Sequence, residues 1–139
     1  MIPGYALPPI FTIKEIRVGV AICYDLRFPE LFRNLALRGA QVIVMPSAWY
    51  AGPLKEEHWL TLLKARAIEN TIYVAGANLI RGAFSGRSSI FDPFGVLIAG
   101  GGENPELIIG TISLERINEV RSKLPSLANC RLELFARRE

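Results

Sequence analysis

The sequence has few of the residues that build metal sites, disulfide frameworks or nucleic-acid-binding surfaces. It contains one histidine and two cysteines among 139 residues, too few for a disulfide framework or for a metal centre with ordinary ligand spacing. Its 16 Lys and Arg residues exceed its 13 Asp and Glu residues, but no run of basic residues is longer than two. Such scattered charge argues against a nucleic-acid partner. We therefore expect neither a metal site nor a nucleic-acid interface.

Long hydrophobic runs are also missing. The longest apolar stretches, near residues 18–24 and 107–109, are much shorter than a membrane-spanning helix. The first residues, MIPGYALPPIF, lack the basic segment and the continuous apolar core of a signal peptide. We therefore expect a cytoplasmic protein without a membrane partner. Half of the residues are hydrophobic and 21% are charged, which excludes a disordered chain and predicts one domain over residues 1–139.

The hydrophobic pattern predicts an α/β fold. Residues Arg17–Cys23 and Gln41–Met45 are apolar and rich in β-branched side chains, as buried parallel strands are. A helix is expected between them from Pro29 to Gly39, because proline is favoured in a first helical turn and glycine after a last one. These segments form a strand–helix–strand crossover. A longer helix over Glu56–Asn70 and a strand over Tyr73–Ala77 follow.

Shorter elements are expected on either side of this unit. Residues 1–13 contain three prolines and are expected to be irregular. The segments after Ala77 resemble antiparallel hairpins. They are strands at Ser88–Phe91, Val96–Ala99 and Ile108–Ile112, followed by a short helix near Leu114–Ser122. Together the segments predict a mixed sheet in a single α/β unit.

Cys23 lies at the carboxyl end of the first predicted strand, directly before a turn and a helix. In open α/β sheets, ligands bind at the carboxyl ends of the strands. The surrounding sequence ICYDLRFPEL adds the charged residues Asp25, Arg27 and Glu30 to this end of the sheet. Position alone allows two interpretations: a partly exposed nucleophile, or an ordinary small core residue.

The segment VGVAICYDLRFPELFRNLALRGAQVIVMPSAW resembles the nucleophile region of the nitrilase superfamily, the carbon–nitrogen hydrolases. Further segments match in the same order: EEHWLTLLKARAIENTIYVAGAN, SGRSSIFDPFGVLIA and RSKLPSLANCRLELF. The combination of HW, ARAIEN and FDPFG is most similar to the amidase branch that includes deaminated glutathione amidase and omega-amidase. The resemblance runs from about Gly4 to Phe135. Because several motifs match in register, it is far more specific than any single motif.

This resemblance implies hydrolysis of a small amide by a cysteine nucleophile. Cys23 corresponds to the family's nucleophile, which forms a thioester that water then hydrolyses. The backbone N–H of Tyr24 corresponds to an oxyanion donor that acts beside a lysine side chain. No cofactor is implied, because this chemistry uses only protein groups and water. The pocket residues implied by the resemblance are Ser47, Ala48 and Trp49, with His58 and Trp59 as further candidates.

The family fold is an α-β-β-α sandwich of two related halves, and this sequence resembles the C-terminal half. We therefore expect a mixed sheet with helices on one face and an exposed hydrophobic face on the other. The family's glutamate base and catalytic lysine lie in motifs upstream of the cysteine. The only lysine and glutamate before Cys23 are Lys14 and Glu15, and neither lies in those motifs. The resemblance thus predicts a truncated form that lacks the N-terminal half and is inactive on its own.

Several alternatives remain open. A Cys23–His58 dyad is the one conventional replacement for the missing pair. A second alternative is a non-catalytic module that associates with itself, with an intact homologue or with a complementary N-terminal half. A third is a degenerate product without function. A small amide is expected as substrate only when the missing half is supplied.

A few polar residues have two interpretations. Side chains after the third predicted strand either donate to a substrate carboxylate or serve as ordinary loop residues. These residues are Asn78, Arg81, Arg87 and Ser88–Ser89. Cys130, in the final segment, is expected to be structural or incidental.

Overall fold

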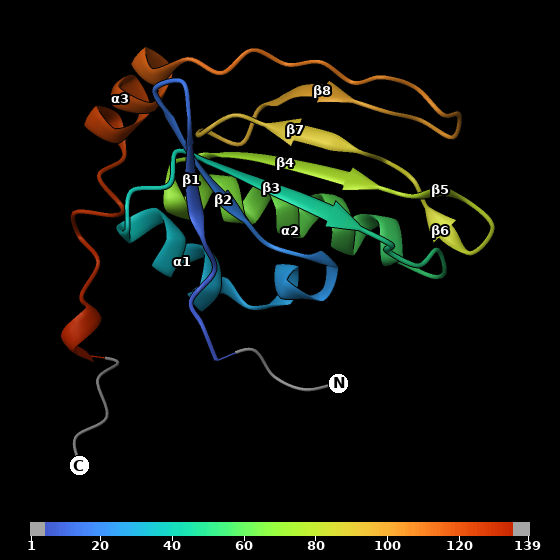
Figure 1. Ribbon diagram of the computed structural model, residues 1–139, viewed down its shortest axis with the longest axis horizontal. Coiled ribbons are helices and arrows are strands. Elements are labelled where there is room, and N and C mark those ends of the chain that lie inside the picture. Colours follow the sequence, from blue (N-terminus) through green and yellow to red (C-terminus); the bar gives the residue numbers. More distant parts are fainter. Residues whose placement is uncertain (1–4, 135–139) are drawn as a thin grey trace.

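The computed structural model describes residues 5–134 of the chain. Its framework is a six-stranded mixed sheet in the order β1-β2-β3-β4-β7-β8 (Figure 1). The central strands β2, β3 and β4 are parallel, and the outer pairings are antiparallel. The strands are β1 (Ile10–Ile13), β2 (Ile16–Val20), β3 (Val42–Ser47), β4 (Tyr73–Asn78), β7 (Ser89–Phe91) and β8 (Leu97–Gly100), and a small hairpin pairs β5 (Ile80–Arg81) with β6 (Phe84–Ser85).

Helices α1 (Pro29–Leu37) and α2 (Lys55–Asn70) lie side by side against one face of the sheet, behind the strands in Figure 1. Strand side chains alternate between the two faces, and Ile43 and Val74 point into this layer, where they are fully buried. Trp59 of α2 is fully buried as well. It packs so closely on β4 that a Cβ at Gly76 would lie 2.7 Å from its ring. Glycine is therefore required where α2 crosses β4.

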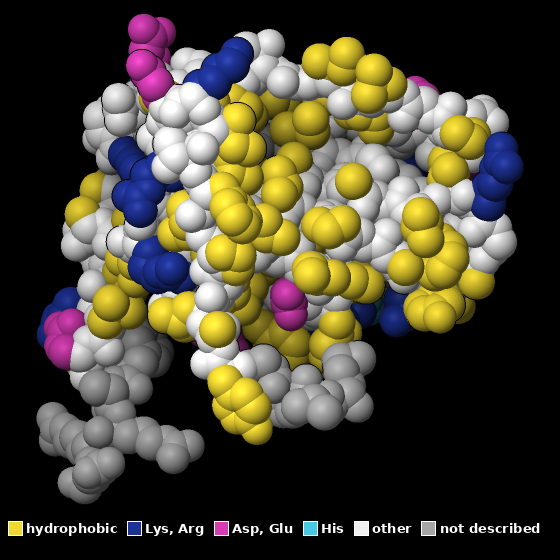
Figure 2. Space-filling model, viewed as in Figure 1, with side chains coloured by type: hydrophobic (Ala, Val, Ile, Leu, Met, Phe, Trp, Pro, Cys, Tyr) yellow, Lys and Arg dark blue, Asp and Glu magenta, His cyan; other side chains and the backbone are white. Residues whose placement is uncertain are grey.

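The opposite face of the sheet is covered at only one end. There Val18, Val42 and Tyr73 pack against Ile117 of the short helix α3 (Leu114–Lys123). Toward the carboxyl ends of the strands this face is open, and Figure 2 shows hydrophobic side chains gathered across the middle of this side of the molecule. The expected exposed hydrophobic face is therefore present. The predicted mixed sheet is confirmed, with α1 and α2 on one face and α3 over one end of the other.

The predicted helices begin and end within a few residues of the observed ones, but two other segments were wrongly predicted. Residues 1–13 are not uniformly irregular, since Ile10–Ile13 forms β1 and pairs with β2. Its β-branched residues can pair because the prolines precede it, and Lys14 makes the tight turn with a φ of 55°. Residues 108–112 form no strand. This segment crosses the open face, where Gly110 lies close to Ile90.

The strand predicted over Arg17–Cys23 is also shorter than expected. β2 ends at Val20, and Cys23 instead begins a 3₁₀ turn, η1 (Cys23–Arg27). A second 3₁₀ turn, η2 (Leu132–Leu134), lies in the final described segment. Within residues 5–134, no helix combines the length and apolar character needed to cross a bilayer.

Candidate active site

Cys23 sits at the sharp connection between β2 and α1. It is half-buried, and its φ of 44° lies in the left-handed region, where a residue with a side chain is strained. Asp25 holds this connection. Its carboxylate accepts a hydrogen bond from the backbone N–H of Ile22 at 2.8 Å, and its own N–H donates to the Ile22 carbonyl at 2.9 Å. Strain that is stabilised by local hydrogen bonds is typical of functional residues.

Arg66 of α2 secures the other end of the same turn. Its Nε and Nη2 donate to the carbonyl of Leu26 at 3.1 and 2.8 Å. The guanidinium is buried, lies 5.5 Å from the ring centroid of Phe32, and pairs with Glu69 at 3.1 Å. Because Leu26 is fully buried, its carbonyl depends on this donor. Arg66 therefore positions the turn that carries Cys23.

A pocket of about 250 Å³ opens beside Cys23 at the carboxyl ends of the parallel strands. One wall is Trp49, which follows β3 and is buried. Its backbone N–H donates to Oδ1 of Asn78 at 2.7 Å, and its indole N–H donates to the carbonyl of Lys55 at 2.8 Å. The complete lining is Cys23, Tyr24, Arg27, Ala48, Trp49, Tyr50 and Lys55.

The structure brings most of the predicted site residues to this pocket. Those that line it are Cys23, Tyr24, Ala48 and Trp49. Ser47 ends β3 outside the lining, with a buried hydroxyl that has no hydrogen-bond partner in the described part of the chain. His58 is exposed on α2 and does not share the pocket with Cys23. Trp59 is fully buried 5.5 Å from Trp49, between ring centroids, and so supports the wall from behind.

Asn78 serves the fold rather than a ligand. Its amide Nδ2 donates to the hydroxyl of Ser85 at 3.0 Å and to the carbonyl of Gly86 at 2.8 Å, while Oδ1 accepts from Trp49. The hydroxyl of Ser88 accepts from the backbone N–H of Asn78 at 3.0 Å. These bonds join the end of β4 to the pocket wall and to the β5–β6 hairpin. The geometry thus favours structural roles for Asn78, the last residue of β4, and for Ser88 over the binding of a substrate carboxylate.

Comparison with known proteins identifies the family. The family model described as carbon-nitrogen hydrolase matches residues 1–122. The chain belongs to the carbon–nitrogen hydrolase family. It is 47% identical to the deaminated glutathione amidase of Escherichia coli O157:H7 over 92% of this chain and 49% of that protein.

Solved structures of this family share the fold. Nit3 of Saccharomyces cerevisiae, a member of branch 10 of the nitrilase superfamily, matches with a TM-score of 0.84 and 33% identity over 90% of this chain and 47% of that one. A mutant amidase from Nesterenkonia sp. AN1, with covalent addition of the acetamide moiety of fluoroacetamide at its active-site cysteine, matches with a TM-score of 0.81 and 30% identity over 96% of this chain and 48% of that one. The chain thus spans about half the length of these relatives. The predicted resemblance to the nitrilase superfamily is confirmed.

Two residues that shape this pocket were missed by sequence reasoning, whereas Arg27, expected at this end of the sheet, does line the pocket. Lys55 lines the pocket as well, and Arg66 positions the turn that begins at Cys23. The motif ARAIEN indicated the family, but not the contact of its arginine with Leu26. One signal was available, since Arg66 stands among apolar residues on the inward side of a helix, and a buried arginine requires partners.

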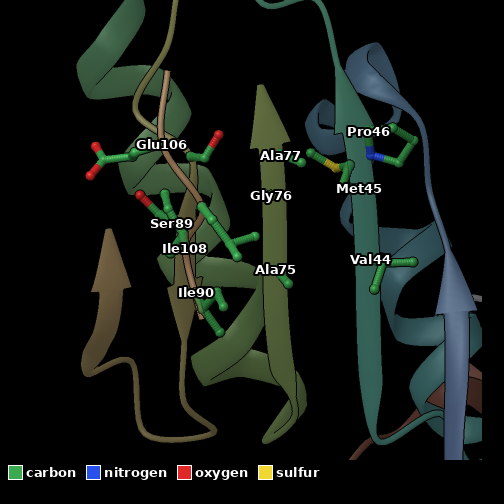
Figure 3. A pocket seen from close by; sticks show the side chains of 12 residues that line it. Val44, Met45, Pro46, Ala75, Gly76, Ala77, Ser89, Ile90, Glu106 and Ile108 are labelled. Atoms are coloured by element: carbon green, nitrogen blue, oxygen red, sulfur yellow. The ribbon is translucent and has the colours of Figure 1, made fainter. Parts of the chain in front are cut away.

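A second hollow of about 470 Å³ lies on the open sheet face (Figure 3). Side chains of β3, β4 and β7 line it, and the segment around Glu106 and Ile108 runs along β7 at one side of it. Its polar groups are used internally: Glu106 accepts from the N–H of Gly102 at 2.8 Å, and Ser89 donates to the carbonyl of Arg87 at 2.9 Å. This hollow has the mostly apolar lining of a packing surface and holds no cysteine. Within residues 5–134, no three potential metal ligands gather in one place.

Proposed function

We propose that the chain carries the nucleophile and one side of the substrate pocket of an amidase that acts on small amides. The observation that carries this proposal is the strained backbone of Cys23 at the mouth of a pocket, at the carboxyl ends of parallel strands. The covalent adduct on the active-site cysteine of the Nesterenkonia amidase supports it.

The reaction proceeds through a thioester. The Cys23 sulfur bonds to the amide carbon, the thiol proton passes to a base, and the C–N bond breaks as ammonia leaves with a proton from that base. Water then adds to the thioester, and the C–S bond breaks to release a carboxylic acid and the thiol. The backbone N–H of Tyr24 stabilises the oxyanion. Among residues 5–134, no acceptor takes this N–H, so it is available.

The base and the oxyanion lysine come from polypeptide outside these 139 residues. The pocket lining contains no carboxylate. Lys14 and Glu15 form the turn between β1 and β2, at the opposite end of β2 from Cys23 (Figure 1). The open hydrophobic face offers a surface on which a complementary half would pack. On its own, the chain is expected to release no ammonia.

A second candidate function is a non-catalytic association module. The observation that favours it is the same open face, because apolar surface of this extent promotes association whether or not catalysis follows. In that case the chain binds a second copy, an intact relative or a complementary half without generating a reaction site. The two functions differ in one measurable product, which is ammonia.

The test is ammonia release from a panel of omega-amides. The purified chain is assayed alone and mixed with the N-terminal half of a related amidase, with Cys23→Ala and Cys130→Ala as matched variants. We expect activity only in the mixture, its loss in Cys23→Ala, and its retention in Cys130→Ala. Activity that survives Cys23→Ala would refute the proposal. A stable mixed complex that releases no ammonia would favour the association module.

A further inference from the structure

Arg66, which holds the turn that begins at Cys23, is a buried cation paired with Glu69. Its side chain is 6% exposed, and its Nη1 donates to Oε1 of Glu69 at 3.1 Å. A buried guanidinium without an anion is costly, because it has lost the water that would stabilise its charge. Within residues 5–134, no other carboxylate pairs with Arg66. The placement of Arg66 therefore depends on Glu69.

The two partners of Arg66 occupy different edges of its guanidinium. Nη1 faces Glu69, while Nε and Nη2 donate to the carbonyl of Leu26. Arg66 and Glu69 are three positions apart on α2, and residues at this spacing are neighbours on a helix surface. Because the guanidinium is planar and rigid, a contact on one edge fixes the direction of the other edge. Glu69 thus aims the Nε–Nη2 edge at the turn.

The place of Glu69 is unfavourable for its own helix. It lies in the last turn of α2, which contains no basic residue, and a carboxylate at a helix C-terminus opposes the helix dipole. Asn70 Nδ2 approaches the same Oε1 at 3.4 Å but donates at 2.9 Å to the carbonyl of Arg66. One-third of the Glu69 side chain is exposed. Its contribution therefore has to come mainly from the contact with Arg66.

The C-terminal segment fixes the helix end that carries Glu69. The last carbonyls of a helix lack partners within the helix, and the carbonyl of Glu69 accepts instead from the hydroxyl of Ser126 at 3.1 Å. Ser126 lies in the segment that follows α3 and descends beside α1 in Figure 1. Nearby, the hydroxyl of Thr71 accepts from Nε of Arg121 at 3.2 Å. Glu69 is thus held by its backbone as well as by its carboxylate.

Resting on the proposed function, we infer that Glu69 is a positioning residue for the Cys23 nucleophile. It acts through Arg66. The carboxylate aims the guanidinium, the guanidinium holds the carbonyl of Leu26, and the turn from Cys23 to Leu26 keeps its strained backbone. Glu69 does not line the pocket beside Cys23, so its role is to shape the turn and not to bind substrate.

Hydrogen exchange measured by NMR tests this inference without amide hydrolysis. The reporters are the amide hydrogens of Asp25 and Phe28, which donate within the turn to the carbonyls of Ile22 and Asp25 at 2.9 and 3.0 Å. Amide hydrogens of the paired strands β7 and β8 are the reference, because a general loss of stability would speed exchange there as well. The measured quantity is the ratio of the exchange rate in the turn to that in the reference strands.

Glu69→Ala should raise this ratio about two- to fivefold, the range expected when a partly exposed ion pair is lost. Glu69→Gln, which keeps a side-chain oxygen at the same length, should raise it less. Glu103→Ala removes the same charge from an exposed loop position and should leave the ratio within experimental error. In an Arg66→Met background, Glu69→Ala should add nothing, because Glu69 acts through Arg66.

Four outcomes would overturn the inference. They are an unchanged ratio in Glu69→Ala, an equal rise in Glu103→Ala, a rise in Glu69→Gln as large as that in Glu69→Ala, and an undiminished effect of Glu69→Ala in the Arg66→Met background. Because hydrogen exchange requires no turnover, a failure here is distinguishable from a failure of the proposed amidase reaction, which depends on ammonia release and Cys23→Ala.

Discussion

Replacing Arg66 with methionine should loosen the turn that begins at Cys23 and destabilise the protein. The side chain reaches from α2 to the carbonyl of Leu26 with two donors, at 3.1 and 2.8 Å. Methionine fills much of the same apolar space beside Phe32 but offers no N–H group. The carbonyl is then left buried without a partner, and the turn that begins at Cys23 loses its contact with α2.

The expected cost follows from these contacts. A buried carbonyl that loses its partner costs about 1–3 kcal/mol. The ion pair with Glu69, which is one-third exposed, adds at most about 1 kcal/mol. We therefore expect Arg66→Met to lower the free energy of unfolding by about 2–4 kcal/mol, a large part of the roughly 5–15 kcal/mol that holds a domain folded.

Urea unfolding followed by circular dichroism measures this change. The midpoint should fall while the slope with denaturant stays constant. Lys64→Met, two residues away on the exposed side of α2, is the matched control and should cost less than about 0.5 kcal/mol. The alkylation rate of Cys23 by iodoacetamide should also change in Arg66→Met and not in Lys64→Met. A loss in Arg66→Met no larger than that of the control would refute the positioning role.

Three further predictions concern packing, charge and the open face. Gly76→Ala places a Cβ 2.7 Å from a tryptophan ring and should cost about 1–3 kcal/mol in urea unfolding, whereas Gly102→Ala has its nearest neighbour at 4.0 Å and should cost little; equal costs would contradict the packing described. The hydrogen bond from Lys123 lowers the pKa of Glu119, so its stabilising contribution is present above the ordinary pKa of 4.5 and is lost as the pH falls through the lower, folded value. Acid titration of Glu119→Gln should accordingly show a shallower loss of stability below about pH 4.5 than the unaltered chain, and parallel curves would count against the pair. Leu107, in the segment between β8 and α3, is 84% exposed, and Leu107→Glu should reduce self-association measured by light scattering. Unchanged scattering would contradict this prediction.

The helices of this protein could be predicted from local patterns. Pro29 and Gly39 bracket α1, and the apolar spacing of α2 repeats with the helical period, so both follow from interactions within a few residues. The parallel strands β3 and β4 are likewise apolar runs of the expected length. The strand at residues 108–112 was wrongly predicted because an apolar stretch is compatible both with pairing and with lying across a sheet. Only its contact with Ile90 and its neighbours on the open face decides between them.

The candidate site also has one part that the sequence predicts and another that it does not. The motif around Cys23 and its position after a strand were sufficient to propose the nucleophile, since a motif is a local property of the chain. The pocket around it is not local. Lys55 lines the same pocket as Cys23 only because the crossover through α1 brings the carboxyl ends of β2 and β3 side by side, and Arg66 reaches Leu26 across 40 positions of sequence.

The sequence by itself therefore determined the secondary elements with strong periodicity and the family, and it proposed Cys23 as the nucleophile, because each depends on residues close together in the chain. The tertiary structure alone decided which residues line the pocket beside Cys23 and which arginine supports its turn. Those features depend on burial and on long-range contacts, and a side chain's partners across the fold are not encoded in the residues beside it.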